Sequence, residues 1–442
     1  MQRRFDSSNE IVILNPKLYK ESYSSQESRI FPYYAGYSSE FSKALISSLG
    51  LTSESIVLDP WNGSGTTTKS AHDIGVDSIG FDLNPAMVVV AKARLLSPLE
   101  HPSLISIAKN LIEQSRYNLK FQSISSDDPL LTWFSPCSAH LLRVLECSIN
   151  HVFISNSAYL PLKNNMAMDK LSPLAAFLYV SLFRTVRRLL IDFTTSNPTW
   201  IKSPKSKYHR KRPSHDKIFD YFLMEIKSLI LRESSRNELN RETSAGTTLG
   251  VGNAEKILLP DNSIDAIVSS PPYCTRIDYA VSTTLELATL QFNEKEFDSL
   301  RRSLTGTSTV EKVANTLDES WGKTCVSFLD KLYSHPSRAS QGYYYKNHLQ
   351  YFRSLFNSLR EISRTLKADG LCFLVVQNSH YKEIHNDVPT IVSEMADGLG
   401  LKLFRRDDFL TAHSMVKVNL KSKKYLSNRN TTESVLCFKN YQ

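Results

Sequence analysis

The chain has 442 residues, a net charge of +9 and a hydrophobic content of 41%. This length exceeds the roughly 100–200 residues of an average domain, which predicts one large elaborated domain or two to three smaller ones. Charged residues make up 22%, close to globular averages, and this excludes a disordered, collagen-like or disulfide-scaffold protein. The excess of 53 Lys and Arg over 44 Asp and Glu favours polyanionic partners, although a mildly basic enzyme would show the same balance.

The six cysteines include neither a CxxC pair nor a compact framework, so we expect no disulfides, no structural zinc and a reducing compartment. The chain opens with MQRRFDSSNE, whose charges precede no apolar run, and no later stretch reaches the roughly 18 apolar residues of a membrane span. These patterns predict a soluble cytoplasmic protein without a membrane anchor or a bound metal.

The first predicted elements form a βαβα unit. Ser55–Pro60 is a short apolar run that ends on proline, and Gly65–Gly75 reads as a short helix that a glycine stops. Ser78–Leu83 is a second buried strand, and a helix over residues 85–95 begins on a proline at its favoured first position.

The pattern changes over residues 98–249. Long amphipathic segments, including Leu174–Phe193 and Ile218–Glu242, occur there without a comparable buried strand, which indicates a helical insertion. Between these two segments, residues 196–213 are rich in Pro, Ser and positive charge and contain no acidic residue, which predicts an exposed loop.

Strand-like runs return at Ser263–Ser270 and Leu371–Val376. The second is preceded by a helix with apolar residues at three- and four-residue steps from Leu349 to Leu366, and Gly370 is placed to end that helix. Alternating strands and helices predict an α/β fold with a doubly wound, mostly parallel sheet. Two further strands, 401–410 and 433–439, can form an antiparallel pair at its edge.

Residues 59–67, Asp-Pro-Trp-Asn-Gly-Ser-Gly-Thr-Thr, place two glycines at a strand-to-helix turn. Absent side chains let a ligand approach the backbone there, and a helix N-terminus offers free N–H groups. This glycine loop lacks the Gly-Lys-Ser/Thr ending of a Walker A loop and the third glycine of the dinucleotide fingerprint. On this pattern alone, a tight turn without a ligand is an equal alternative.

Asp82 ends the second predicted strand about 20 residues after these glycines, where a doubly wound nucleotide-binding fold has an acid that accepts hydrogen bonds from ribose hydroxyls. The alternative is that Asp82 caps the next helix, but Asn84 can cap it instead. The pattern therefore predicts a ligand that carries a ribose.

The tetrapeptide Ser270-Pro271-Pro272-Tyr273 follows a predicted buried strand, which places it at the carboxyl edge of the sheet, where such folds bind ligands. Two prolines hold a hydroxyl and a carbonyl in fixed directions, and Tyr273 can present a flat face to a flat substrate. A proline-rich turn would be the preferred interpretation if the tetrapeptide stood alone.

Taken in order, these motifs resemble those of the S-adenosylmethionine-dependent amino-methyltransferases, which modify cytosine N4 or adenine N6 in DNA. Residues 31–41, FPYYAGYSSEF, look like the segment that folds over the methionine end of the cofactor, and DPWNGSGTT looks like the family's DPFxGSGTT loop. Gly252–Glu255 is similar to the stretch that contacts adenine, with Asn253 replacing the usual Asp. The Ser-first tetrapeptide is the form that leans towards cytosine N4. The similarity covers about residues 31–97 and 250–440, and leaves the middle of the chain unmatched.

The resemblance implies a cofactor-binding half over residues 1–97, an insertion over 98–249 suited to target recognition, and a catalytic half over 250–442. It implies these cofactor-binding residues: Tyr34, Asp59, Pro60, Gly63, Ser64, Gly65, Thr66, Thr67, Asp82, Asn253 and Ala254. The catalytic residues would be Ser270, Pro271, Pro272 and Tyr273. The Ser270 hydroxyl and the Pro271 carbonyl would hold the amine, and Tyr273 would stack on the flipped base without a covalent intermediate. We expect Cys274 to be a buried thiol and not a nucleophile.

A second group of residues has the composition of a loop that binds a nucleic-acid backbone and stacks an aromatic ring on a base. These residues are Trp200, Lys202, Lys205, Lys207, Arg210, Lys211 and Arg212, and Arg276 near the tetrapeptide can touch phosphate as well. A solvated face and a surface ion pair are the alternatives. The resemblance implies a cytosine-N4 methyltransferase with double-stranded DNA as partner and a cognate restriction nuclease as a further candidate. An adenine-N6 enzyme, an RNA methyltransferase and a non-catalytic nucleic-acid-binding scaffold remain as alternatives.

Overall fold

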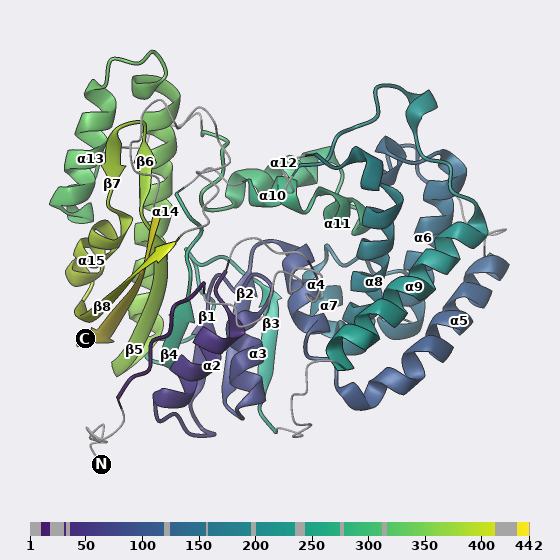
Figure 1. Cartoon of the computed structure of the whole chain (residues 1–442), viewed down its shortest axis with the longest axis horizontal. Helices are drawn as coiled ribbons and strands as arrows, with labels where there is room; N and C mark the ends of the chain where they lie inside the picture. Colours follow the sequence, from purple (N-terminus) through teal and green to yellow (C-terminus); the bar gives the residue numbers. More distant parts are fainter. Residues whose placement is uncertain are drawn as a thin grey trace.

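A seven-stranded, mostly parallel sheet lies at the centre of the fold (Figure 1). The computed structural model describes residues 10–17, 31, 36–118, 124–155, 158–195, 200–234, 244–274, 278–311, 316–411 and 431–441. The strand order is β3-β2-β1-β4-β5-β9-β8. The strands of this sheet are β1 (Ile56–Asp59), β2 (Asp77–Asp82), β3 (Thr247–Val251), β4 (Ile264–Ser269), β5 (Leu366–Gln377), β8 (Leu401–Thr411) and β9 (Thr431–Asn440).

The predicted doubly wound α/β sheet is confirmed. Strands β1 to β5 pair in parallel, whereas β9 is antiparallel to both β5 and β8. The two C-terminal strands therefore form the expected antiparallel pair, with β8 at the edge. The chain runs from β1 through β2 to β3 and then returns to the other side of β1 at β4. The strand order therefore reverses between β1 and β4. Doubly wound folds bind ligands at such a point.

Strand β3 was not predicted from the sequence. Only Leu249 among its five residues is buried, and the two residues before Leu249 in the strand are threonines. An edge strand of this composition gives neither an apolar run nor a clear alternation.

The placement of Gly370 as a helix end is wrong. Helix α14 (Tyr345–Thr365) stops five residues earlier, and Gly370 lies inside β5, next to Asp369, which has a positive φ of 60°. The pairing of β4 with β5 shifts its register in this part of the strand. Gly370 therefore lies in an irregular, bulged part of a strand and does not cap a helix.

Alternate strand residues supply two separate hydrophobic layers. On one face Val57, Val268 and Phe373 pack against helix α2 (Ser39–Ser48) and helix α3 (Thr66–Asp73). On the other face Leu58 and Ile267 pack in a cluster with α14 and its neighbours. The helices of that second layer are α13 (Lys323–Ser334), α14 and α15 (Val388–Gly398), joined by the hairpin of β6 (Ser379–Tyr381) and β7 (Ile384–Asn386).

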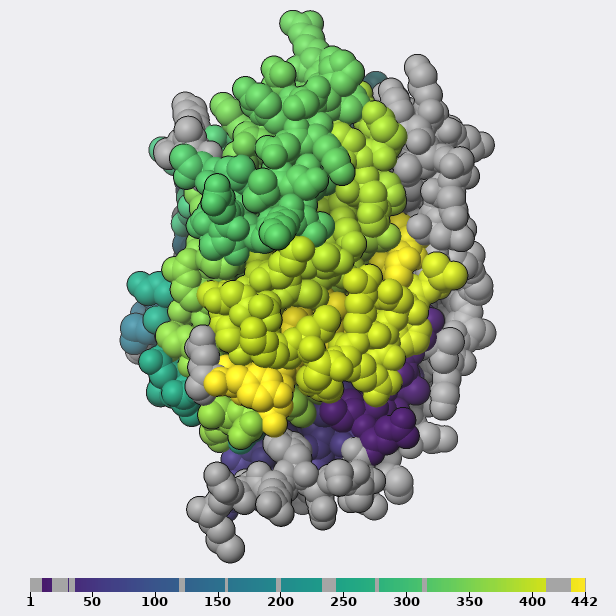
Figure 2. Space-filling view, turned by 90° about the vertical axis from the view of Figure 1, so that its left-hand side faces the viewer, coloured from purple at the N-terminus to yellow at the C-terminus, as the bar shows by residue number. Residues whose placement is uncertain are grey.

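Figure 2 shows the side of the molecule formed mainly by this green to yellow C-terminal part, with purple N-terminal residues packed beside it. Arg405 of β8 donates a hydrogen bond to the Ile11 carbonyl at 2.8 Å, which attaches residues 10–17 to the sheet.

The segment between β2 and β3 is helical over most of its described length, and Figure 1 shows its helices gathered on one side of the sheet, beyond β3. These helices are α4 (Pro85–Ala93), which follows β2, and α5 (His101–Asn118), α6 (Pro136–Phe153), α7 (Asn165–Lys170), α8 (Pro173–Leu189) and α9 (His215–Ser234). They share one hydrophobic cluster, in which α4 connects the helices to the sheet. The two long predicted segments correspond to α8 and α9, and residues 235–242 of the second lie outside the described residues.

Three helices follow the Ser270–Tyr273 tetrapeptide, namely α10 (Tyr279–Ser282), α11 (Thr284–Thr289) and α12 (Glu294–Ser303). An ion pair and hydrogen bonds from arginines join the first two of them to this helical region. Arg187 of α8 donates to the fully buried carboxylate of Glu286 at 2.8 Å and to the Ser282 carbonyl at 2.8 Å. Arg143 of α6 donates to the Thr289 carbonyl at 2.6 Å. Helices α10 and α11 are therefore held against the helical region. Among the described residues, no helix combines the length and the apolar character that a membrane crossing needs.

Candidate active site

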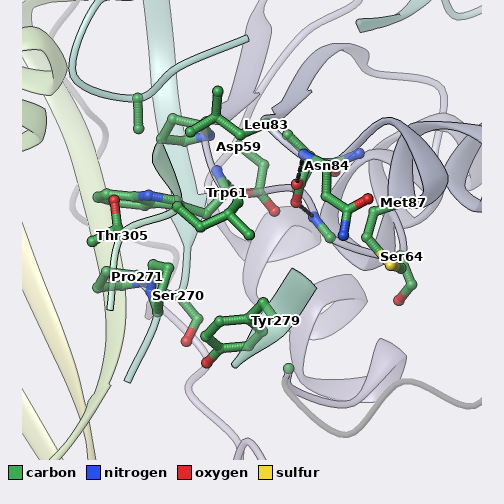
Figure 3. Close-up of a pocket in the computed structure, with 18 of the residues that line it drawn as sticks. Asp59, Trp61, Ser64, Leu83, Asn84, Met87, Ser270, Pro271, Tyr279 and Thr305 are labelled. Atoms are coloured by element: carbon green, nitrogen blue, oxygen red, sulfur yellow. Dashed lines mark hydrogen bonds between the residues drawn. The ribbon is translucent and has the colours of Figure 1, made fainter. Parts of the chain in front are cut away.

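One pocket brings together the motifs that are separated in the sequence (Figure 3). It lies at the carboxyl ends of β1, β2, β3 and β4, at the point where the strand order reverses. Of the residues predicted from the sequence, those lining it are Asp59, Pro60, Gly63, Ser64, Thr66, Asp82, Asn253, Ala254, Ser270, Pro271, Pro272 and Tyr273.

Gly63 and Gly65 have positive φ angles of 49° and 80°, which a glycine adopts without strain. A Cβ at Gly65 would also lie 2.8 Å from the Cβ of Ala91, so the loop can approach α4 only with glycine there. Gly65 and Thr67 do not line the pocket. Gly65 shapes the turn, and Thr67 lies buried beneath it.

A buried hydrogen-bond network supports the glycine loop from below. Asp59 accepts hydrogen bonds from the Ser269 hydroxyl at 2.5 Å and from the Trp61 N–H at 3.1 Å. Tyr37 bonds with Thr67, and both hydroxyls reach the Val268 carbonyl. Burial raises the pKa of Asp59 to about 6, against the lowering effect of these donors. These hydrogen bonds connect β1, β4 and the loop before α2 beneath the glycine loop.

Asp82 holds the glycine loop with both carboxylate oxygens. Oδ2 accepts from the Gly63 N–H at 2.9 Å and Oδ1 accepts from the Asn84 N–H at 2.8 Å. The helix cap is Asn84, whose side chain accepts from the Ala86 N–H, so the capping alternative for Asp82 is not what the structure shows. Burial raises the pKa of Asp82 to about 6, and at neutral pH the group is mainly ionised.

Gly252–Ala254 form the wall after β3. A Cβ at Gly252 would lie 2.9 Å from the ring of Phe81, so this close packing requires glycine. The side-chain oxygen of Asn253 accepts from the Glu255 N–H at 2.9 Å. An aspartate could accept the same hydrogen bond, which explains how asparagine replaces it without changing the turn.

The Ser270–Tyr273 tetrapeptide is fixed by hydrogen bonds along its length. The Ser270 hydroxyl donates to the Val375 carbonyl at 2.8 Å, and the Pro272 carbonyl accepts from the Tyr351 hydroxyl at 3.0 Å. The Tyr273 N–H donates to the Tyr279 hydroxyl at 3.3 Å. In Figure 3, Ser270 and Pro271 lie on one side of the pocket, with Ser64 and Met87 on the other.

Comparison with known proteins shows a similarity to DNA methylases. Residues 13–93 match a family model for N6/N4 DNA methylases, described as DNA methylase. This match and the relatives below show that the chain is similar to DNA amino-methyltransferases.

Three relatives illustrate the similarity. The Type II methyltransferase M.BsoBI of Geobacillus stearothermophilus is 24% identical over 61% of this chain and 54% of its own. M.AvaI of Anabaena variabilis is 24% identical over 85% of this chain and 79% of its own, and M.MvaI of Kocuria varians is 25% identical over 76% and 73%. The match therefore spans about half the length of M.BsoBI. The match to M.AvaI covers more of the chain than the residues outside 98–249 can supply, so the similarity extends into the helical region, which the sequence motifs did not show.

Cys274 follows the tetrapeptide as a protonated thiol. Burial raises its pKa to about 12, and only a thiolate is a strong nucleophile. This supports the expectation that Cys274 is a structural residue. All six cysteines are free. Among the described residues, no cluster of three or more His, Cys, Asp or Glu side chains is arranged to hold a metal ion.

The basic loop is exposed, as predicted, over its described residues 200–213. The side chains of Trp200 and Tyr208 are 54% and 88% exposed. Trp200 lines a second pocket together with Ser282, and Ser282 also lines the first pocket, so the start of the loop adjoins the active-site region. Lys211 pairs with Asp192. The predicted basic residues between 202 and 212 line neither of these two pockets.

Two predicted residues, Tyr34 and Arg276, lie outside the described residues. Several pocket residues were not predicted from the sequence, namely Gly36, Tyr37, Trp61, Asn62, Leu83, Asn84, Met87, Ser282, Thr283, Leu304 and Thr305. Trp61 and Tyr37 stand inside motifs that were recognised, so their position was a usable signal. Leu304 and Thr305 follow α12 without any motif, and only the fold brings them to the pocket.

Proposed function

We propose that this protein transfers a methyl group from S-adenosylmethionine to the N4 amine of cytosine in double-stranded DNA. The observation that carries the proposal is the position of the Ser270 hydroxyl, which lies in the same pocket as the glycine loop and Asp82 and is oriented by the Val375 carbonyl. The proposed acceptor for the amine and the proposed binding loop for the methyl donor therefore line one pocket.

The residues of the pocket fit the proposed cofactor. The two oxygens of Asp82 each accept one backbone N–H, and a carboxylate oxygen has a further lone pair for a ribose hydroxyl. Gly63 and Ser64 line the pocket, and Asn253 and Ala254 form a wall suited to a flat adenine. When bound, S-adenosylmethionine supplies an electrophilic methyl group on a sulfonium sulfur.

Ser270 and Pro271 have the chemistry to hold the amine. The lone pair of an exocyclic amine is delocalised into the base ring, so it attacks well only when its N–H groups are held in alignment. Ser270 gives its own proton to the Val375 carbonyl at 2.8 Å, which leaves the lone pairs of its oxygen for an amine N–H. The Pro271 carbonyl, in a backbone stiffened by two prolines, would accept the other N–H. Positioning of this kind contributes a large share of the acceleration in a direct displacement.

Tyr273 lines the pocket beside these acceptors, and we propose that the target base, rotated out of the duplex, stacks on its ring. Cytosine is favoured over adenine because the tetrapeptide begins with serine and not with aspartate.

We propose DNA as the substrate because Trp200, at the start of the exposed basic loop, lies beside the pocket region. Phosphate contacts provide most of the sequence-independent affinity for DNA. Residues 98–249 would recognise the target sequence, between the cofactor-binding and catalytic halves. A cognate restriction nuclease is a candidate partner, since the relatives are named Type II methyltransferases, and a reducing cytoplasm is the compartment we expect.

Transfer of a labelled methyl group from S-adenosylmethionine to unmethylated DNA amplified in vitro tests this function, with RNA as the competing substrate. We expect labelling of DNA, abolished by Ser270→Ala. Ser263→Ala is the matched control, because Ser263 precedes the other end of the same strand and its hydroxyl donates to the Pro260 carbonyl at 2.7 Å, away from the pocket. Labelling of RNA alone, or binding of DNA without binding of the cofactor in calorimetry, would overturn the proposal.

A further inference from the structure

A buried carboxylate lies behind the ring of Tyr273. Glu433 is on β9, near the carboxyl end of β5, and its side chain is 0% exposed. Its Oε1 accepts a hydrogen bond from the Tyr273 hydroxyl at 2.6 Å. Glu433 is 160 residues away from Tyr273 in the sequence, and it does not line the pocket.

Lys17 completes this arrangement from the N-terminal segment. Its Nζ lies 3.3 Å from Glu433 Oε1 and 5.7 Å from the centre of the Tyr273 ring. The same ammonium donates to the Gly36 carbonyl at 2.6 Å, and Gly36 lines the pocket next to Tyr37. One cation therefore contacts the wall of the cofactor pocket, the buried carboxylate and the aromatic ring.

These contacts restrain the ring of Tyr273 at several points. Its backbone N–H is held by the Tyr279 hydroxyl, its own hydroxyl is held by Glu433, and the ammonium lies over the ring. Burial, and next the charge of Glu433, raise the pKa of the Tyr273 hydroxyl well above its usual range, so the hydroxyl remains a proton donor. Because a cation over an aromatic ring occupies one of its faces, at most one face is left for a stacked base.

We infer that Glu433 and Lys17 are positioning residues for Tyr273: the buried carboxylate sets the plane of the base-stacking ring, and Lys17 connects that ring to the Gly36 wall of the cofactor pocket. The inference rests on the proposed function, because it assigns the purpose of the restraint to base stacking. A buried ion pair that only stabilises the fold is the competing explanation, since replacing one partner of such a pair destabilises a protein whatever its role.

The test uses the full chain with Tyr273→Phe, Glu433→Leu, the double variant and the conservative Glu433→Gln. A hydrogen bond to a charged group makes a contribution that corresponds to about tenfold or more in rate. We expect Tyr273→Phe and Glu433→Leu each to lower kcat for DNA methylation about tenfold, and the double variant to be no slower than either, because both remove the same hydrogen bond. Cofactor affinity should hardly change in these three variants. Glu433→Gln keeps an acceptor oxygen and should recover most of the rate.

Lys17→Met gives a different expected result, since Nζ also holds the Gly36 carbonyl. This variant should weaken cofactor binding in calorimetry as well as lower kcat. Comparison with the Glu433 variants should therefore separate the contact of Lys17 with Gly36 from its contact with Glu433. An unchanged cofactor affinity in Lys17→Met would contradict the connection to the pocket wall.

Urea unfolding of the same variants without cofactor gives a readout that does not depend on activity. The effects of Tyr273→Phe and Glu433→Gln on the unfolding equilibrium should be non-additive, because the two groups are in contact. Multiplied losses of kcat in the double variant, or equal losses of kcat and cofactor affinity in Glu433→Leu, would overturn the positioning role. If Glu433→Leu does not fold, Tyr273→Phe still tests the role by itself, because it removes the same hydrogen bond from the other side, and a wild-type kcat in Tyr273→Phe would overturn the inference. Failure of the proposed function would look different, since the wild-type protein itself would then methylate no DNA.

Discussion

Replacing Asp82 by alanine probes the cofactor pocket most sharply. The change removes the acceptor for two backbone N–H groups, at 2.9 Å for Gly63 and 2.8 Å for Asn84, together with the proposed acceptor for the ribose hydroxyls. Hydrogen bonds to a charged group contribute about 1.5–3 kcal/mol. The dissociation constant for S-adenosylmethionine should therefore rise about 10- to 150-fold, since each 1.4 kcal/mol is a factor of about ten.

Calorimetric titration of the purified variant with S-adenosylmethionine measures this change directly. Asp77→Ala is the control, because Asp77 begins the strand that Asp82 ends and also accepts a backbone hydrogen bond, from the Gly246 N–H at 2.6 Å. The control should bind the cofactor as the wild type does. Wild-type affinity in Asp82→Ala would refute the ribose contact, and equal losses in both variants would mean that the strand, and not the carboxylate, is what matters.

Three further predictions concern pH, the aromatic ring and the basic loop. Burial raises the pKa of Asp82 to about 6, so protonation below that pH removes the negative charge that accepts hydrogen bonds from hydroxyl groups. Calorimetry should therefore show that the affinity for the cofactor falls between pH 7 and pH 5. The fall should be less steep in Asp82→Ala. Tyr273→Ala should lower kcat/KM for DNA by about 5- to 150-fold, because base–aromatic stacking contributes about 1–3 kcal/mol. The affinity for the cofactor should stay nearly intact. A matching loss of cofactor affinity would show that Tyr273 is not the stacking residue. Removing charges from the basic loop should make DNA binding less dependent on salt. The plot of log K against log salt concentration should become shallower by about 0.9 for each phosphate that the protein no longer neutralises. Lys211 should contribute least, because it already pairs with Asp192. The residues to neutralise are Lys205, Lys207, Arg210, Lys211 and Arg212. Neutralising Lys402 and Lys439, at the opposite edge of the sheet, is the control, and an unaltered slope in the loop variant would leave the loop as a solvated face.

Local sequence patterns were sufficient for the parts of the fold that local forces decide. Short apolar runs identified β1, β2, β4 and β5, and Asn84 was correctly expected to cap α4. The convergence of the glycine loop, Asp82 and Ser270–Tyr273 on one pocket could be predicted because the carboxyl ends of parallel strands meet at one edge.

Features set by distant parts of the chain were not predictable in this way. Glu433 reads as one polar residue at the start of an apolar strand, and only the antiparallel placement of β9 beside β5 brings it to Tyr273. Thr305 reaches the pocket through packing that no local pattern encodes. Gly370 was taken as a helix end because glycine has the same preference for irregular backbone in a bulged strand as at a cap.

The central claim is that Ser270 and Pro271 present an exocyclic amine of DNA to the methyl donor. Digestion of DNA from cells that express the protein, followed by mass spectrometry of the nucleosides, tests it most directly. The proposal predicts N4-methylcytosine in the DNA of cells with the wild-type protein and none with Ser270→Ala. N6-methyladenine would contradict the choice of base, and DNA without either modification would contradict the claim itself.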